Sequence, residues 1–208
     1  MKTLLEAPKN ARACYVMAHG AGAGLTHPFL ASVAKELAAR GIATLRYNFP
    51  YMERSSKRPD SPKVAQAAVR EAVALAAEAV PELPLFAGGK SFGGRMTSQA
   101  QAAEPLPGVL GLVFLGFPLH APGKESDERG AHLFDVKVPM LFLQGTRDDF
   151  AKMELLKPLV KNLGKGATLT TFEDADHSFH VPARTGRKDT DVMQELVEAM
   201  ATWMIKLL

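Results

Sequence analysis

A G-x-S-x-G motif at residues 89–93 places Ser91 between an apolar run at 85–88 and a helix-compatible segment that begins near Arg95. Such a turn from strand to helix is very tight. Glycines lack a Cβ, so they let the neighbouring elements approach while the serine is held in a strained conformation. The serine hydroxyl then stands at a helix N-terminus, beside backbone N–H groups that can stabilise a developing oxyanion. The motif therefore predicts that Ser91 is a nucleophile.

Two other interpretations of this motif compete with the nucleophile. A glycine-rich turn with Ser91 as a helix N-cap would carry no chemistry. The sequence Gly89-Lys90-Ser91 also matches the end of a Walker A phosphate-binding loop, which requires a glycine five positions before the one that precedes the lysine. Pro84 occupies that position, so the sequence disfavours phosphate binding. The surrounding elements must decide between a nucleophile and an ordinary turn.

Strand-like and helix-like segments alternate along nearly the whole chain. Apolar runs predict strands at 13–18, 42–47, 85–88, 109–115, 140–144 and 168–172, and helical spacing or capping residues predict helices at 28–40, 62–79, 95–103, 153–163 and 190–207. Strands that are apolar on both faces and separated by helices are typical of a parallel sheet covered on both sides. We therefore expect an α/β fold: one doubly wound, mostly parallel sheet of about six strands, with helices on both faces, in a single domain over 1–208.

Candidate partners for Ser91 follow two of the later strands. Asp148 and Asp149 come just after the fifth predicted strand, and His177 lies in the loop between the sixth strand and the last helix. Ligands of such sheets bind at the carboxyl ends of the strands. A histidine there can take the serine proton near neutral pH, and a carboxylate can fix the imidazole tautomer. The order serine, aspartate, histidine predicts a catalytic triad, with Asp148 favoured as the acid and Asp149 as its alternative.

The chain resembles the α/β-hydrolase superfamily over nearly its whole length, and more narrowly a compact, uncapped subgroup related to dienelactone hydrolases. The stretches 19–22, 46–50, 89–94, 116–119 and 145–148 carry the narrower resemblance. It implies that Ser91 is the nucleophile, His177 the general base and acid, and Asp148 the orienting acid, with the backbone N–H groups of Ala21 and Phe92 forming an oxyanion hole. It also implies a serine hydrolase that cleaves carboxylic esters or thioesters through an acyl-enzyme, without a cofactor.

The chain departs from the superfamily pattern in three places. Only residues 1–12 precede the first predicted core strand, so the usual N-terminal antiparallel strands are reduced or absent. Residues 117–137 show no clear helix, where the fold commonly has one or inserts a lid. Lys90 occupies a position beside the nucleophile that many esterases fill with histidine or an acid. None of these departures removes a catalytic group.

Three further residues are candidates for substrate binding: His19, Lys90 and His120. His19 heads the turn that would carry part of the oxyanion hole, and a structural histidine with satisfied hydrogen bonds is its simpler interpretation. Lys90 adjoins the nucleophile, and His120 lies near a carboxyl-end loop. Each would contact a small-molecule ester or thioester.

A metal-site interpretation also exists for the loop around His177. Asp174, Asp176, His177 and His180 include an H-x-x-H spacing, but no regular helix is predicted to bring the two histidines together. We therefore expect no metal, and we expect Asp176 to shape the turn that carries His177.

One group of residues bears on substrate charge. Eight basic residues lie in or beside segments at the predicted carboxyl ends of strands: Arg46, Arg54, Lys57, Arg58, Lys90, Arg95, Lys124 and Arg147. Ordinary solvated loops explain such a pattern, because loops often carry charge. The other interpretation is a cationic mouth that attracts an anionic ester or acyl carrier.

Composition limits the remaining functional classes. The chain has 208 residues and a formal net charge of +3, without a long run of like charges, so nucleic-acid binding is not expected. No apolar run is long enough for a membrane span, and no signal-peptide pattern opens the sequence, so we expect a cytoplasmic protein.

The lone Cys14 fits a small buried apolar residue. No feature predicts an oligomeric state. The competing functional class is a non-catalytic binding or scaffold protein on the same fold.

Overall fold

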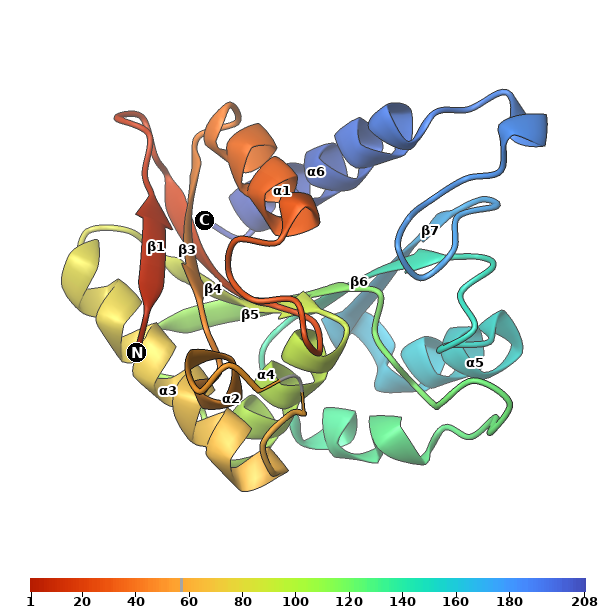
Figure 1. Cartoon of the computed structure of the whole chain (residues 1–208), viewed down its shortest axis with the longest axis horizontal. Coiled ribbons are helices and arrows are strands. Elements are labelled where there is room, and N and C mark those ends of the chain that lie inside the picture. The colour runs from red at the N-terminus through yellow and green to blue at the C-terminus, as the bar shows by residue number, and fades with distance from the viewer. Residues whose placement is uncertain (57) are drawn as a thin grey trace.

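In the computed structural model, which describes residues 1–56 and 58–208, the chain folds around a seven-stranded sheet with the order β1-β3-β2-β4-β5-β6-β7 (Figure 1). The strands are β1 (Thr3–Glu6), β2 (Ala13–Ala18), β3 (Ile42–Tyr47), β4 (Leu85–Lys90), β5 (Val109–Leu115), β6 (Met140–Gly145) and β7 (Ala167–Phe172). Every neighbouring pair is parallel except β1 and β3. The predicted doubly wound, mostly parallel sheet is confirmed.

Strand β1 is the one that the sequence pattern did not predict. It pairs antiparallel with β3 at the edge of the sheet, and its residues Leu4 and Leu5 are 40% and 39% exposed. A short edge strand that buries little apolar surface lacks the apolar run or strict alternation on which the prediction depended. Within residues 1–56 and 58–208, β1 is the one strand that pairs antiparallel in the sheet.

Helices cover both faces of the sheet (Figure 1). The helices α1 (Pro28–Ala38) and α6 (Asp189–Lys206) lie on one face, and α2 (Pro50–Glu53), α3 (Pro62–Ala79), α4 (Phe92–Ala103) and α5 (Met153–Leu163) lie on the other. Successive side chains of a strand point to opposite faces. Accordingly, Tyr15 and Met17 of β2 pack in the core beneath α1 and α6, whereas Cys14 and Val16 pack in the other core.

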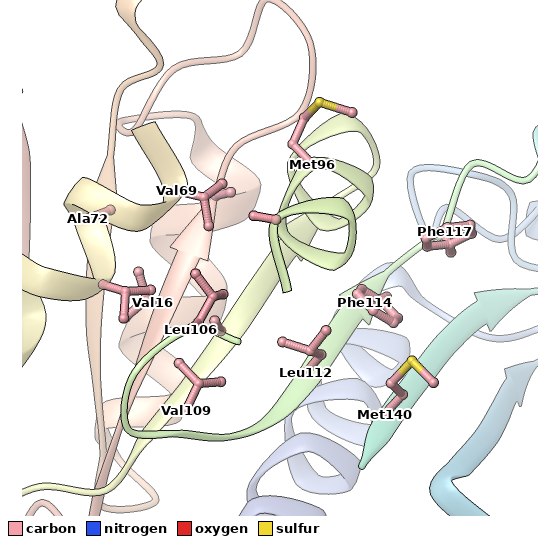
Figure 2. Close-up of a cluster of buried hydrophobic side chains, with 14 of the residues drawn as sticks. Val16, Val69, Ala72, Met96, Leu106, Val109, Leu112, Phe114, Phe117 and Met140 are labelled. Atoms are coloured by element: carbon pink, nitrogen blue, oxygen red, sulfur yellow. The ribbon is translucent and has the colours of Figure 1, made fainter. Parts of the chain in front are cut away.

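The core beneath α3 and α4 fixes the helix that follows Ser91. Figure 2 shows Val69 of α3 and Met96 of α4 among the same buried side chains as Val16 of β2 and Phe114 of β5. All four are at most 2% exposed. Burial of a side chain of this size contributes about 1.5–3 kcal/mol, so the cluster holds α4 firmly against the centre of the sheet.

The structure changes the boundaries around the serine turn. Strand β4 extends to Lys90 rather than 88, and α4 begins at Phe92 rather than near Arg95. Strand and helix therefore meet at Ser91 alone. The expectation that 117–137 lacks a clear helix was wrong in part, because Glu128–Asp135 forms the 3₁₀ helix η1. The glycine within it, Gly130, interrupts the helical pattern in the sequence.

The helix η1 contacts α4 through His132, whose pKa is lowered. Ser98 Oγ and His132 Nε2 lie 2.7 Å apart. Burial, followed by the nearby positive charge of Arg95, lowers the pKa of His132 from 6.5 to about 4. Between these two values the unfolded chain binds a proton that the folded chain does not, so stability falls as the pH is lowered through this range.

We therefore expect wild-type protein to lose about 2 kcal/mol more unfolding free energy between pH 7 and pH 5 than His132→Gln, which has no proton to take up. Urea unfolding of both proteins at the two pH values measures the difference. Equal losses in the two proteins would contradict the assignment.

Candidate active site

The serine turn has the strained geometry that its glycines predicted. Ser91 has φ 49° and ψ −114°, an unusual conformation for a residue with a side chain. A Cβ on Gly89 would lie 2.2 Å from the carbonyl oxygen of Ala18, and one on Gly93 would lie 2.6 Å from that of His19. Only glycine fits at both positions. The close packing leaves Ser91 at the mouth of a cavity, directly before α4.

Ser91, His177 and Asp148 lie in one hydrogen-bonded chain. The Oγ atom of Ser91 is 2.9 Å from Nε2 of His177, and Nδ1 of His177 is 2.7 Å from Oδ2 of Asp148. The three residues come from the carboxyl ends of β4, β7 and β6. The structure thus brings together the three side chains that the sequence singled out, although 86 residues separate Ser91 from His177.

Asp148, rather than Asp149, is the acid that contacts the imidazole. Asp148 is 2% exposed, and its Oδ1 accepts a hydrogen bond of 2.8 Å from the backbone N–H of Phe150. The Asp149 side chain is 76% exposed and pairs with Lys152. Burial and fixed donors hold the Asp148 carboxylate in one orientation, whereas Asp149 faces solvent.

Gln144 is a site residue that sequence reasoning missed. Its Nε2 donates to Oδ2 of Asp148 at 2.5 Å, and its Oε1 accepts from the backbone N–H of Phe117 at 2.9 Å. The side chain is fully buried. A polar amide inside the otherwise apolar strand β6 was the available signal, because a buried polar group needs hydrogen-bond partners.

Phe150 also went unnoticed in the sequence. Its ring lies 4.4 Å from the imidazole of His177, centroid to centroid, at an interplanar angle of 33°. It therefore covers one side of the histidine and limits the orientations that the imidazole can adopt. No sequence pattern distinguishes this phenylalanine from an ordinary loop residue.

The two residues expected to supply the oxyanion hole lie in the turn after β2 and directly after Ser91. Phe92 is the first residue of α4, and Ala21 lines the cavity in the turn after β2. Among the described residues, neither N–H donates a hydrogen bond to a protein acceptor. The same turn is fixed by the neighbouring N–H of Gly22, which donates to the hydroxyl of Tyr51 at 2.9 Å.

Lys90 reaches the histidine loop. Its Nζ donates a hydrogen bond of 2.5 Å to the backbone carbonyl of His177 and lies 5.5 Å from the ring centroid of Phe179. Burial lowers the pKa of Lys90 to about 8, against the opposing effects of Asp148 and Asp176. The group that the sequence offered as a substrate contact is thus already bound to the protein.

A cavity of about 330 Å³ opens beside the serine. Its walls combine the segments at the carboxyl ends of β2, β4, β6 and β7 with the start of α1: Gly20, Ala21, Ala23, His27, Phe29, Leu30, Lys90, Ser91, Phe150, His177 and Ser178. The wall contributed by α1 is apolar. The space is that of a small organic molecule.

The other two histidine candidates lie outside this lining. His19 is buried, with Nδ1 2.7 Å from the carbonyl oxygen of Gly20 and Nε2 accepting from the N–H of Phe49. His120 is also buried, and its Nε2 accepts from the N–H of Lys152. Both rings serve the loop backbone, which matches the structural interpretation of His19.

Few of the eight basic residues approach the cavity. Arg46 is buried and pairs with Glu6, and Arg54 pairs with Asp60. Lys57 lies outside the described residues. Of the seven that the structure describes, Lys90 alone lines the cavity. Their arrangement resembles ordinary charged loops more than a cationic mouth.

The loop around His177 is organised by hydrogen bonds rather than as a metal site. Oδ1 of Asp176 accepts from the N–H groups of Ser178 and His180, so Asp176 shapes the turn as predicted. His180 pairs with Asp189 instead of joining His177. Within 1–56 and 58–208, no group of histidine, cysteine and carboxylate side chains could hold a metal ion.

In the same ranges, no helix has the length and apolarity that a membrane crossing requires.

Residues 11–205 match the family model described as "Alpha/beta hydrolase domain". The chain belongs to this family. Among solved structures, it is similar to a dienelactone hydrolase from Anabaena variabilis, with 20% identity, a TM-score of 0.79, and coverage of 98% of this chain and 90% of that one. The predicted membership of the α/β-hydrolase superfamily is confirmed, and the likeness to this dienelactone hydrolase is one of fold.

Two more solved structures share the α/β-hydrolase fold. An alpha-beta serine hydrolase homologue from Coxiella burnetii is 20% identical, with a TM-score of 0.76 and coverage of 95% of this chain and 90% of that one. Est1E from Butyrivibrio proteoclasticus, solved with ferulic acid bound, is 16% identical, with a TM-score of 0.68 and coverage of 96% and 95%. At these identities the likeness establishes the fold.

The contacts of Gln144 lead to a stability prediction. Gln144→Leu should lower the unfolding free energy by about 1–3 kcal/mol, because it leaves the buried N–H of Phe117 without its acceptor and removes one donor from the Asp148 carboxylate. Gln99→Leu is a matched control, since that half-buried amide has a single side-chain hydrogen bond among the described residues, to Gln66, and it should change stability by less than about 0.5 kcal/mol. Urea unfolding at pH 7 measures both. Equal effects would contradict the role of Gln144.

Proposed function

We propose that this α/β-hydrolase cleaves carboxylic esters or thioesters by acyl transfer to Ser91. The observation that carries the proposal is the hydrogen-bonded chain from Ser91 through His177 to Asp148, at the edge of a small cavity. A serine hydroxyl is a weak nucleophile until a neighbouring base removes its proton. The 2.9 Å contact with His177 Nε2 supplies such a base within hydrogen-bond reach.

In the first half-reaction, Ser91 Oγ attacks the acyl carbon and its proton passes to His177 Nε2. The bond from the acyl carbon to the leaving oxygen or sulfur then breaks, and His177 returns the proton to the leaving group. In the second half-reaction, a water molecule gives a proton to His177 Nε2 and attacks the acyl carbon. The bond from that carbon to Ser91 Oγ then breaks, and His177 returns the proton to Oγ, which releases the acid and free Ser91. Asp148 keeps Nδ1 protonated and stabilises the imidazolium formed in each half.

The backbone N–H groups of Ala21 and Phe92 would stabilise the oxyanion of the tetrahedral intermediate. One such donor typically contributes about 3 kcal/mol to the transition state. The N-terminus of α4, which begins at Phe92, adds a favourable dipole for negative charge. Because no protein group accepts these N–H hydrogens in the described part of the chain, they are free for a substrate.

The cavity favours small acyl groups. Phe29 and Leu30 give it an apolar wall on the α1 side, within a volume of about 330 Å³. A short or compact acyl chain would bury its apolar surface there, whereas a long lipid chain would extend into solvent. We therefore place the substrate among small-molecule esters and thioesters.

A fluorophosphonate probe tests the proposal, because it reacts with an activated serine and needs no knowledge of the substrate. Wild-type protein should be labelled, and Ser91→Ala should abolish labelling. His177→Ala should slow it by about 10²–10⁴-fold, which is the usual contribution of a general base. Ser32→Ala, an exposed position on α1, is the matched control and should label like wild type.

A folded wild-type protein that resists labelling would contradict the proposal. Circular dichroism and a cooperative thermal transition would establish that the protein is folded. Such a result would instead favour the competing class, a binding or scaffold protein that retains the hydrolase fold.

A further inference from the structure

The Lys90 side chain crosses the carboxyl edge of the sheet. It leaves the last position of β4, immediately before Ser91, and its Cγ lies 3.6 Å from where a Cβ on Gly20 would be. Its Nζ lies 2.9 Å from the corresponding position on Gly116, after β5. The glycine at 116 leaves room for the ammonium group, and the distance at Gly20 is that of an ordinary van der Waals contact. Lys90 thus passes from the turn after β2 to the turn after β5.

At its end, Lys90 binds the residue that carries the imidazole. Nζ donates to the carbonyl oxygen of His177 at 2.5 Å, across 87 positions of sequence. The residue beside the nucleophile is therefore joined to the backbone of the residue that would act as base. A hydrogen bond from an ammonium to a carbonyl is stronger than one between neutral groups.

The loop that carries His177 needs such restraint. Asp174 and Phe179 both have positive φ angles, 57° and 64°, which are unfavourable for residues with side chains. On the β6 side, the N–H of Arg147 holds the carbonyl of Ala175 at 2.9 Å. On the β4 side, Lys90 supplies the corresponding hydrogen bond to the loop backbone.

We infer that Lys90 is a positioning residue: its ammonium group holds the His177 backbone so that the imidazole stays within reach of Ser91. This inference rests on the proposed function, because it concerns the same reaction. Lys90 need not touch the substrate in this role, since its nitrogen is engaged by the carbonyl of His177 and lies over the Phe179 ring.

Kinetics of Lys90→Met test the inference. Methionine keeps most of the apolar stem but cannot donate a hydrogen bond. We expect kcat to fall by about 10- to 100-fold, as expected for a displacement of a reacting group by about 1 Å, with KM changed less than about twofold. Lys124→Met, which removes an exposed lysine and the same charge, should leave both constants unchanged.

Two esters of equal acyl length, one neutral and one bearing a carboxylate, separate positioning from substrate binding. A positioning residue lowers kcat for both esters alike. A rise in KM confined to the carboxylate ester would overturn the inference and make Lys90 a substrate contact. An unchanged kcat for both esters would also overturn it.

Chemical rescue separates the ammonium group from simple packing. Lys90→Cys treated with bromoethylamine regains a side chain of lysine's length with a terminal ammonium, whereas iodoethane adds an uncharged chain. The native Cys14 is fully buried, which directs alkylation of the folded protein to position 90. Recovery of kcat with bromoethylamine alone supports the inference, and equal recovery with both reagents overturns it.

A spectroscopic readout keeps this test independent of turnover. The proton on His177 Nδ1, hydrogen-bonded to Asp148, should give a downfield proton resonance that Lys90→Met broadens or shifts and Lys124→Met does not. A wild-type protein that neither labels nor hydrolyses esters would refute the proposed function, and the resonance would then still report whether Lys90 orients the imidazole. An unchanged resonance in Lys90→Met would refute the positioning role.

Discussion

In β4, between β2 and β5, Gly88 and Gly89 have φ angles of 152° and 145°, which would direct any side chain into the backbone of a neighbouring strand. A Cβ on Gly88 would lie 1.9 Å from the carbonyl oxygen of Val113, and one on Gly89 would lie 2.2 Å from that of Ala18. This close packing continues into α4 at Gly93. Because strand and helix are pressed together here, Ser91 has to turn the chain within a single residue. The strained serine is a result of how the sheet and helix pack.

The rest of the site is built so that this fixed serine meets equally fixed partners. Asp148 is buried with donors on both carboxylate oxygens, from Gln144 on one side and the Phe150 backbone on the other. His177 is then held between Asp148 and Ser91, under the Phe150 ring. Groups positioned in advance need little reorganisation during a reaction, which is a major source of catalytic power in enzymes.

The sequence was most informative where chemistry depends on backbone topology. The alternation of strands and helices along the chain and the turn at Ser91 were enough to predict that Asp148, His177 and Ser91 would lie at the same edge of the sheet. Contacts between side chains of distant segments were not predictable in this way. Gln144 and Phe150 match common residue types in a strand and a loop, and their importance arises only from what folding brings beside them. Strand β1 was not predicted because an exposed edge strand has little apolar pattern to detect.

One face of the sheet is completed by helices that are far apart in the sequence. Arg40, just after α1, binds Glu198 of α6 at 2.9 Å, although 158 residues separate them. At ribosomal rates of roughly 5–20 residues per second, about 8–30 seconds pass between their syntheses. During this interval, α1 and the apolar side chains that α6 later covers have no native neighbour on that side. The nascent chain therefore exposes this apolar surface until α6 has been synthesised. Chaperone binding would protect the protein most during that interval.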